Sequence, residues 1–583
     1  MVVGEAWGYE EEKQGLPFVG QSGQELDRMF AEAGIPVADL LFTNVINARP
    51  ENNEAWRFFN PPSKAPSLVE LNGLHPSPLV TSNLARLYEQ IDVMKPKLII
   101  AVGNYALWAL TGHSDYSIAK DKAGKSTGIR APSGIMRWRG SQTWLKIPHN
   151  SFYRFTSIRP TPVLPIIHPA SILRQWDQRA ITVHDLKERV PKVRAGMIGW
   201  EKPPRTYLAP PDFDQAKKFL QSILNRAANT TLGPLRLAVD IETLSPMLVC
   251  VGFAPSTTLA MSLPFVKITN AGTKDPVQFD SYWPRWQEKI FITLIRTILT
   301  HPNIDIVGQN FAYDTQYLEE EFGVIPRLRY DTMLMHHLLF PGTTKGLDML
   351  SSLYCDHHVY WKDDGKDWHL NDDLASQLVY NCDDCVKTLE IANTLIEVIE
   401  AQGLTPQWEE TLKRYQLSTS MTRRGVLIDK KARQSMMLSV LQQKATIESW
   451  LAARFPQTSV SDSTKTPWYD SPTQMMELFY SKEKGLGLSP VTDRHTGRPS
   501  TGKEAVEELR HRYPSLMRIF DAIQALRSLG VFHRNFLAKA IDPDGRMRCS
   551  YNPAGTETFR FNSYENAFGR GTNLQNIPSG NED

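Results

Sequence analysis

The chain has 583 residues, a formal net charge of +2 and an ordinary content of 41% hydrophobic and 10% aromatic residues. This length allows about three or four domains with ample cores, and the near-neutral charge excludes a uniformly basic nucleic-acid-binding surface. Five cysteines without a framework spacing favour a reducing compartment, and no apolar run approaches the roughly 20 residues of a membrane span. The N-terminus, MVVGEAWGYEEE, is not a signal peptide. We therefore expect a soluble cytoplasmic protein without a membrane partner.

The first block, residues 1–195, alternates short β-like runs with helical stretches. The runs are LLFTNVI, PKLIIAVG and PVLPIIH, and this alternation is typical of an α/β domain. The proline-rich segment EKPPRTYLAPPDF at 201–213 indicates a linker. We therefore place a domain at 1–195 and a linker at 196–213.

The second block, residues 214–402, contains acidic residues beside apolar runs. Asp240 and Glu242 close the run LRLAVDIE, and residues i and i+2 of a strand point to the same face. Asp314 follows the short run DIVGQ, with Asn310 four residues earlier, a spacing of one helical turn. The pattern predicts an α/β domain with carboxylates at strand and helix ends.

A helix-like stretch, LASQLVYNCDDCVKTLEIANTLIEVI, ends this second block. Tyr380 and Asp384 are again four residues apart in it, so both side chains would lie on one face. Cys382 and Cys385 form a C-x-x-C pair, but no second pair exists to complete a zinc site. We interpret these two cysteines as ordinary helix residues.

Hard oxygen ligands of this kind suit Mg²⁺ or Mn²⁺, and two such ions about 4 Å apart promote displacement at phosphorus. The pattern resembles the proofreading 3'→5' exonucleases of the DEDD superfamily in the tyrosine version, because position 379 is Val rather than His. The resemblance implies a ribonuclease-H-like domain whose metal ligands are Asp240, Glu242, Asp314 and Asp384. It also implies that Tyr380 orients the attacking water and that Asn310 supports its motif or contacts the substrate.

The third block, residues 403–583, is mainly helical and arginine-rich. Five of its arginines lie in the helical stretch 504–541: Arg510, Arg512, Arg518, Arg527 and Arg534. They form either a solvated face, which is the plain interpretation, or a set of phosphate contacts, which is the sharper one. The segments MTRRGVLIDKKA, SPTQMMELFY, STGKEAVEEL and YNPAGTETFRFNS resemble the thumb and the start of the palm of A-family DNA polymerases.

This polymerase resemblance also covers the last segment, NLQNIP at 573–578. It implies primer–template contacts, which we expect from Arg560, Asn573, Gln575 and Asn576. The family's palm motif with its metal-binding aspartate does not follow. We therefore expect an incomplete polymerase domain that extends a primer only if a second chain supplies palm and fingers.

Motifs of the first block resemble the family 4 uracil-DNA glycosylases, which implies an α/β/α sandwich. They are GEAWGYEEEKQGLPFVG, LFTNVINARP, KPKLIIAVGNYALWALTG and PIIHPASILRQ. A glycosylase must hold a flipped base by stacking and edge hydrogen bonds, which the resemblance assigns to Phe18 and Asn44. His168 would donate to the base oxygen, and a carboxylate near the sugar would come from Glu5 or Glu11.

The first block also departs from that family. The sequence LNGLHPSPL spells a different family's histidine motif at His75, but it precedes the KPKLIIAVG run, so we favour His168. Trp7 stands where the family has Pro, and Ala48 stands where it has Cys. Because the block contains no cysteine, we expect no iron–sulfur cluster. An active glycosylase and a non-catalytic module for damaged bases both stay open.

The order of the three blocks resembles that of DNA polymerases from some large bacteriophages. We expect a replication protein in the cytoplasm of a bacterial host, with metal-dependent 3'→5' exonuclease activity on single-stranded DNA ends. The alternatives are a uracil-DNA glycosylase or damaged-base-binding subunit, a non-catalytic subunit of a split polymerase, and an RNA-trimming exonuclease. The thumb-like NLQNIP region argues against the last.

Overall fold

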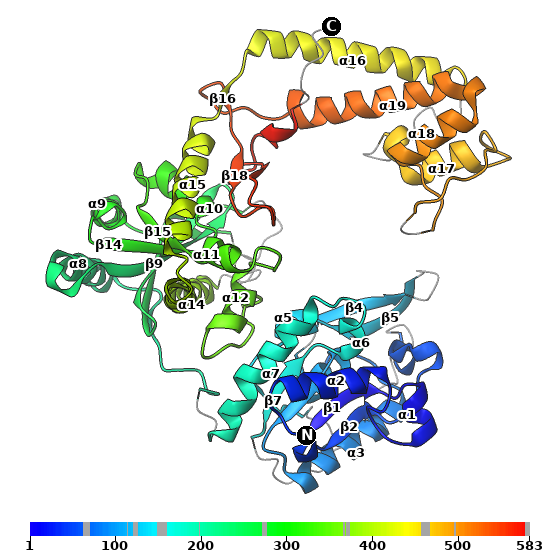
Figure 1. The fold of residues 1–583 in the computed structure, drawn as a ribbon. Helices are drawn as coiled ribbons and strands as arrows, with labels where there is room; N and C mark the ends of the chain where they lie inside the picture. The colour runs from blue at the N-terminus through cyan, green and yellow to red at the C-terminus, as the bar shows by residue number, and fades with distance from the viewer. Residues whose placement is uncertain are drawn as a thin grey trace. The chain divides into compact units, whose positions relative to one another are not determined.

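The fold was analysed in a computed structural model of the chain (Figure 1). It describes residues 1–61, 70–113, 115–120, 126–147, 160–196, 199–270, 277–364, 368, 373–455, 467–494 and 497–577. The chain divides into two compact units, Met1–Asp314 with Leu318–Glu410, and Thr315–Tyr317 with Thr411–Asp583. Among the helices of the described ranges, none combines the length and the apolar character needed to cross a bilayer.

The N-terminal domain is built on a five-stranded sheet. The strand order is β2 (Phe42–Ile46), β1 (Val2–Ala6), β3 (Ile99–Val102), β7 (Pro162–Ile166) and β6 (Thr143–Trp144). The first four strands are parallel and β6 is antiparallel to β7. The carboxyl ends of four strands therefore meet at one edge, where open α/β sheets bind their ligands.

Helices cover both faces of this sheet because its strands are apolar on both sides. Val2 belongs to the core under α2 (Gln21–Glu32) and α7 (Gln178–Arg194). Val3 belongs to the core under α3 (Pro78–Met94) and α4 (Asn104–Thr111). Successive strand residues point to opposite faces, so the predicted α/β/α sandwich is confirmed.

A hairpin and three short helices complete this domain. The hairpin strands are β4 (Asp115–Lys120) and β5 (Ser126–Ser133), and the helices are α1 (Tyr9–Gln14), α5 (Ile135–Trp138) and α6 (Pro169–Ile172). The segment predicted as a linker is partly folded, because Trp200 lies in the N-terminal domain's core and β8 (Thr206–Leu208) is an edge strand of the next sheet. The linker was predicted from the prolines at 203, 204, 210 and 211. An edge strand can lie between such prolines, because one side of it makes no hydrogen bonds to a neighbouring strand.

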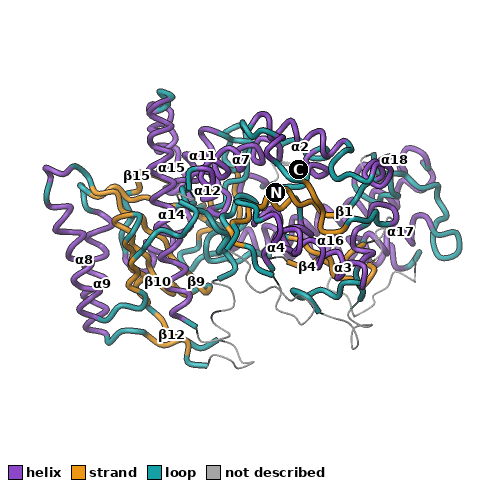
Figure 2. The backbone as a smooth tube through the Cα atoms, turned by 90° about the horizontal axis from the view of Figure 1, so that it is seen from below, coloured by secondary structure: helices purple, strands orange, loops and turns teal. Residues whose placement is uncertain are grey.

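The next domain has a six-stranded mixed sheet. The order is β15 (Leu328–Asp331), β14 (Ile304–Gly308), β9 (Leu235–Leu244), β10 (Met247–Ser256), β11 (Leu259–Pro264) and β8. The long helix α14 (Leu374–Ala401) packs on one face. On the other side, α8 (Phe213–Ala228) and α9 (Arg285–Thr300) lie side by side along the sheet (Figure 2).

Small residues on the strands let α14 approach the sheet closely. Its buried Cys382 and Cys385 belong to one core cluster with Ala238, Ala254 and Ala260, and their place in α14 confirms the interpretation as helix residues. The remaining elements are β12 (Val266–Ile268), β13 (Phe279–Ser281), α10 (Ala312–Phe322), α11 (Thr332–Leu339) and α12 (Leu347–Tyr354).

The second unit is mainly helical, as predicted. Helices α16 (Lys430–Ala452) and α19 (Met517–Phe532) pack together, with α17 (Pro472–Tyr480) and α18 (Lys503–Arg512) around one core (Figure 1). The helix α15 (Thr405–Arg424) leads into it. Short strand pairs close the unit: β16 (Val426–Leu427) with β17 (Arg546–Met547), and β18 (Ser550–Asn552) with β19 (Asn562–Tyr564).

Candidate active site

The acidic pair of the second block lies on β9, near the middle of the mixed sheet. Asp240 and Glu242 are opposite Gly252 and Cys250 of β10. A Cβ atom on Gly252 would lie 2.5 Å from Cys385 Sγ and would also collide with Asn381. The glycine therefore permits the close approach of α14 that brings the third motif to the acidic pair.

Four carboxylates converge here as the sequence predicts. Ligand oxygens of Asp240, Glu242 and Asp384 all lie within 4.8 Å of one another. Asp314, in the first turn of α10, accepts a hydrogen bond from the backbone N–H of Ile241 at 3.1 Å. This bond fixes Asp314 beside β9, the strand that carries Asp240 and Glu242. An all-oxygen set of this kind fits a divalent cation such as Mg²⁺ or Mn²⁺.

Tyr380 lies one helical turn before Asp384, on the same side of α14. Lys362 Nζ donates to Tyr380 Oη at 2.9 Å and to Asp384 Oδ2 at 2.6 Å. The indole Nε1 of Trp361 donates to Asp384 Oδ1 at 2.6 Å. Trp361 and Lys362 therefore orient the two oxygens of Asp384. Both residues lie in a loop that belongs to no sequence motif, so sequence reasoning did not identify them.

Asn381 is a further functional residue that the motif pattern missed. Its amide Nδ2 donates to Asp240 Oδ2 at 2.8 Å, and its Oδ1 accepts from Ser262 Oγ at 2.7 Å. Ser262 thereby fixes the amide orientation. The sequence spacing could have identified Asn381, because it precedes Asp384 by three residues and so lies on the same helix face.

The predicted helical turn between Asn310 and Asp314 is wrong. Asn310 has φ +52° and lies before α10, which begins at Ala312. Its backbone N–H and that of Phe311 donate to Asp331, at 3.2 and 2.8 Å. Asn tolerates the left-handed region better than most residues, so Asn310 shapes the turn that delivers Asp314.

Burial and mutual repulsion raise the pKa values of the clustered acids. Burial, and then Asp384, raise the pKa of Asp240 to about 7. Burial and then Asp240 raise the pKa of Glu242 and of Asp314 well above their ordinary values. Burial works to lower the pKa of Lys362, but Asp384 and Tyr380 outweigh it and hold that pKa above its usual range. A divalent cation would bind by displacing the protons that such a site retains.

A second candidate site lies at the strand edge of the N-terminal domain. Asn44, the third of the five residues of β2, lies opposite Gly4 in the parallel β1–β2 pair. A Cβ atom on Gly4 would lie 2.6 Å from Phe18 Cζ and would also collide with Asn44 Oδ1. The aromatic ring and the amide predicted to stack on and read a base therefore converge over a glycine.

The predicted donor, His168, follows β7 at the same sheet edge. Its Nδ1 accepts from the backbone N–H of Ala170 at 3.1 Å, so the proton resides on Nε2, which is free to donate. His75 lies in the connection before α3, where its backbone oxygen accepts from Asn60. It thus lies on no strand of the sheet.

The two candidate carboxylates have different surroundings. Glu5 lies near the carboxyl end of β1, and its Oε1 accepts from the backbone N–H of Tyr105 at 3.4 Å. Both oxygens of Glu11 accept from backbone N–H groups, of Gly8 at 3.1 Å and Gly20 at 2.8 Å. Glu11 therefore fastens the loop between α1 and α2.

The N-terminal domain does not fit an iron–sulfur cluster. The five cysteines are Cys250, Cys355, Cys382, Cys385 and Cys549, all buried and all outside residues 1–249. The two departures from the family pattern are neighbours, because the Trp7 backbone N–H donates to the carbonyl of Ala48 at 3.2 Å. Ala48 packs against the domain core.

The residues predicted to contact DNA in the second unit partly serve its own fold. Asn573 Oδ1 accepts from Ser563 Oγ at 2.6 Å and from the Gln575 backbone N–H at 3.0 Å. Gln575 Nε2 donates to Phe561 O at 3.1 Å. Arg560 and Asn576 are exposed, and Pro578 lies outside the described residues.

Most arginines of the third block have partners within their own unit. Arg510, Arg512 and Arg534 form ion pairs with acidic side chains. Arg527 donates to the backbone carbonyls of Tyr469 and Thr501, both at 2.7 Å. The solvated-face interpretation therefore accounts for the three ion-paired arginines, whereas Arg527 is half-buried and links two backbone segments.

Known proteins resemble separate parts of the chain. The model of the uracil DNA glycosylase superfamily matches residues 1–192, and that of the 3'-5' exonuclease matches residues 214–400. A type-4 uracil-DNA glycosylase of Pyrobaculum aerophilum is 36% identical over 110 residues, which are 19% of this chain and 46% of that protein. The DNA polymerase I of Borreliella burgdorferi is 23% identical over 296 residues, 50% of this chain and 30% of that protein.

One relative covers nearly the whole chain. The DNA polymerase of Bacillus phage SP01 is 21% identical over 619 residues, which are 94% of this chain and 60% of that protein. The chain spans less than two thirds of each of these three relatives. It therefore combines an N-terminal domain of the uracil-DNA glycosylase superfamily with a 3'-5' exonuclease domain, in a chain homologous to a phage DNA polymerase.

Proposed function

We propose that this chain is a replication protein of the A-family polymerase type, whose own chemistry is metal-dependent 3'→5' removal of nucleotides from DNA. The observation that carries the proposal is the carboxylate cluster of Asp240, Glu242 and Asp384 within 4.8 Å, with Asp314 bound to the same strand. It would act in the cytoplasm of a bacterial host.

In the proposed reaction the four carboxylates hold two Mg²⁺ or Mn²⁺ ions. Such ions, when bound, stabilise the charge that develops on the attacking and leaving oxygens of the phosphodiester. Tyr380 orients the attacking water through its hydroxyl, which Lys362 holds at 2.9 Å. Asn381 and Trp361 keep Asp240 and Asp384 in place through hydrogen bonds of 2.8 and 2.6 Å.

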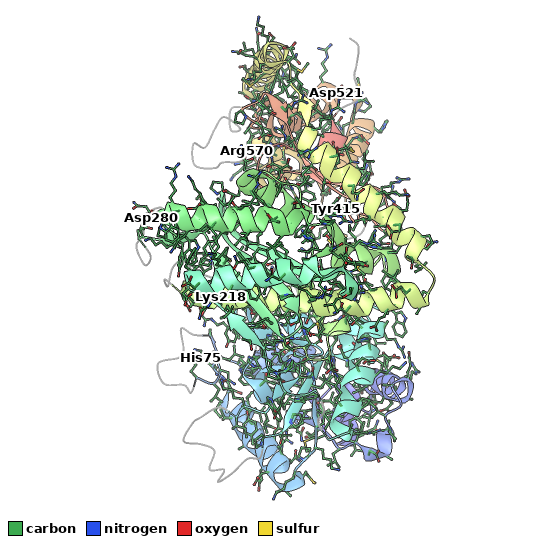
Figure 3. All side chains as sticks on the ribbon, turned by 90° about the vertical axis from the view of Figure 1, so that its left-hand side faces the viewer. His75, Lys218, Asp280, Tyr415, Asp521 and Arg570 are labelled. Carbon is green, nitrogen blue, oxygen red and sulfur yellow. The ribbon has the colours of Figure 1, made fainter. Side chains whose placement is uncertain are left out.

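The test is degradation of a 5'-labelled single-stranded DNA with Mg²⁺, with Mn²⁺ and with EDTA. We expect stepwise shortening that requires a metal and disappears in Asp240→Ala. The matched control is Asp280→Ala, an acid of the β12–β13 hairpin that is 62% exposed and lies at the periphery of the same domain (Figure 3). Equal activity of Asp240→Ala and wild type would refute the assignment.

A DNA substrate is favoured over RNA by the homology to DNA polymerases. We expect a matched DNA oligonucleotide to be degraded faster than its RNA counterpart, and the reverse order would favour an RNA-trimming enzyme. Primer contacts by Arg560 and Asn576, both exposed, belong to this proposal. For primer extension we propose a second chain that supplies palm and fingers, and mixing this chain with a candidate palm chain tests that proposal.

A second function, recognition of uracil or a damaged base, is favoured by the convergence of Phe18 and Asn44 over Gly4 and by the Nε2 donor of His168. The test uses single-stranded DNA with one internal uracil, in excess EDTA to silence the nuclease, followed by alkali. A cut at the uracil identifies a working glycosylase. Intact DNA that binds more tightly than its thymine counterpart identifies a non-catalytic module, and equal binding of both excludes this function.

A further inference from the structure

Two buried arginines of the N-terminal domain reach into the exonuclease domain. Arg139 and Arg189 are 1% and 2% exposed. Arg139 pairs with Asp185 of its own domain and donates to Ser352 Oγ of the exonuclease domain at 3.0 Å. Buried guanidinium groups without partners are very costly, so the two domains of this unit depend on each other for satisfied hydrogen bonds.

Arg189 satisfies the carboxyl end of α12. Its guanidinium donates to the backbone oxygens of Ser352 at 2.9 Å, Cys355 at 3.2 Å and Asp356 at 2.8 Å. The last carbonyls of a helix have no partner within the helix, and a cation there also complements the helix dipole. An arginine of the glycosylase-like domain thus completes a helix of the exonuclease domain.

Further tethers follow along the loop that leaves this helix, residues 355–364. Gln142 and His358 exchange two hydrogen bonds, of 2.8 Å from the Gln142 backbone N–H and 2.9 Å from the His358 backbone N–H. The backbone N–H of Tyr360 donates to Ser141 Oγ at 3.2 Å. Arg137 pairs with Asp363 at 3.1 Å. The N-terminal domain therefore binds this loop along its length.

The same loop carries the side chains that orient Asp384. Trp361 and Lys362 donate to its two oxygens, and Lys362 also reaches Tyr380. Lys387 of α14 lies over the ring of Trp361, 2.8 Å from its centroid. A continuous series of contacts thus runs from the N-terminal domain through the loop to a metal ligand.

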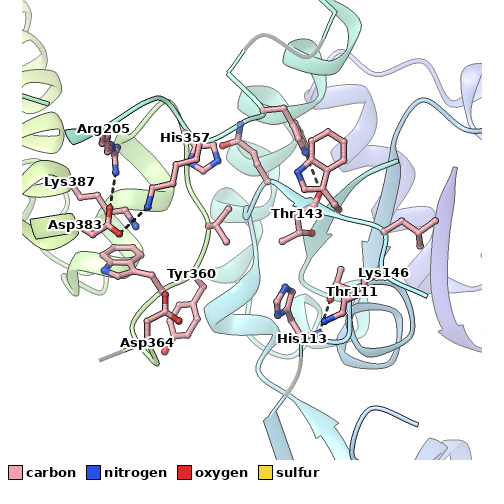
Figure 4. Close-up of a pocket in the computed structure, with 17 residues that line it drawn as sticks. Thr111, His113, Thr143, Lys146, Arg205, His357, Tyr360, Asp364, Asp383 and Lys387 are labelled. Carbon is pink, nitrogen blue, oxygen red and sulfur yellow. Dashed lines mark hydrogen bonds and ion pairs between the residues drawn. The ribbon is translucent and has the colours of Figure 1, made fainter. Parts of the chain in front are cut away.

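A cavity of about 590 Å³ lies on one side of the loop (Figure 4). It is lined by His357, Tyr360 and Trp361 of the loop, by Thr143 and Lys146 of the N-terminal domain, and by Asp383 and other residues of α14 and the linker. Side chains do not fill this space, so packing leaves the loop unsupported on that side. The polar contacts therefore add to the packing of the buried Tyr360 and Trp361 in holding the loop.

We propose that the glycosylase-like domain has a further function as a scaffold for the exonuclease site: it fixes the 355–364 loop so that Trp361 and Lys362 orient Asp384 and Tyr380. Ser141, Gln142 and Arg189 act as positioning residues in it. This proposal rests on the proposed nuclease function. It assigns the N-terminal domain a role that requires neither base excision nor an iron–sulfur cluster.

The test measures Mn²⁺ affinity by electron paramagnetic resonance on the full chain, beside exonuclease rates and amide hydrogen exchange. Trp361→Phe keeps the ring and removes the donor, and we expect about a tenfold weaker Mn²⁺ affinity, as for other partners of metal ligands. Arg189→Lys and Gln142→Ala should weaken Mn²⁺ binding in the same direction but less. Both should also speed exchange of the amides of residues 357–364.

The matched control is Arg179→Ala, because Arg179 forms two ion pairs within the N-terminal domain, with Glu25 at 2.7 Å and Glu32 at 2.6 Å. It should leave Mn²⁺ affinity and loop exchange unchanged. The scaffold proposal is overturned if folded Arg189→Lys and Gln142→Ala match wild type, or if Arg179→Ala is equally impaired. A wild-type chain that neither binds Mn²⁺ nor shortens DNA would instead refute the nuclease function itself.

Discussion

The exonuclease site and the glycosylase-like pocket occupy neighbouring domains, but they differ in completeness. In the first, each predicted carboxylate is present, and Asp240, Asp314 and Asp384 each accept a hydrogen bond of 3.1 Å or less. In the second, Phe18 and Asn44, the residues predicted to hold a base, lie together, while the neighbouring Trp7 and Ala48 depart from the family pattern. The comparison teaches that a fold can keep some residues of a family's site while neighbouring positions change.

The substitution with the largest expected effect removes one negative charge from the exonuclease site and leaves the site of the N-terminal domain unchanged. Asp314→Asn keeps an oxygen for the Ile241 N–H bond of 3.1 Å and removes the negative charge. We expect the exonuclease rate to fall about a thousandfold, because a catalytic metal contributes several kcal/mol. Binding of uracil-containing DNA in EDTA should be unchanged. A similar loss in both assays would show that the two sites are not independent.

The converse change disrupts the candidate site of the N-terminal domain. Gly4→Ala places a methyl group 2.6 Å from Phe18 Cζ and against Asn44, so the ring and the amide must move apart. We expect about a tenfold loss of preference for uracil over thymine, near 1.4 kcal/mol, measured by fluorescence anisotropy in EDTA. The exonuclease rate serves as the internal control. Unchanged preference would place the base elsewhere.

Local periodicity explains which parts of each site were predictable. The i, i+2 spacing of Asp240 and Glu242 and the i, i+4 spacing of Tyr380 and Asp384 fix their faces whatever the tertiary structure. Trp361 and Lys362 carry no such signal, because α12 and the N-terminal domain determine where their loop lies. The same holds for Asn310, whose backbone conformation depends on Asp331.

The partial folding of the predicted linker, residues 196–213, escaped sequence reasoning for a related reason. Prolines indicate a break in regular structure, yet Thr206–Leu208 pairs with β11 at the sheet edge. Arg205 forms ion pairs with Asp383 and Glu390 of α14. Tertiary contacts thus give structure to a segment whose composition predicts none.

A smaller effect concerns acid stability of the exonuclease domain. Burial lowers the pKa of His336 and of His357 to about 4. An unfolded histidine with its ordinary pKa of about 6.5 binds protons that these folded ones exclude, so the unfolding free energy falls as pH drops from 6.5 toward 4. The slope is about 1.4 kcal/mol per pH unit for each histidine. Urea unfolding of His336→Gln should show a reduced slope, and His511→Gln, an exposed residue of α18, should not.

The smallest expected effect distinguishes the two candidate carboxylates of the pocket. Glu11 uses both oxygens to bind the backbone N–H groups of Gly8 and Gly20, so Glu11→Gln should cost about 1 kcal/mol of stability, as for other capping residues. It should leave uracil recognition intact, because its carboxylate serves the α1–α2 loop. Glu5→Gln changes an acid at the strand edge itself and should alter uracil binding or excision with little change in melting temperature. The opposite pattern, with recognition lost in Glu11→Gln and retained in Glu5→Gln, would assign the carboxylate of this site to Glu11.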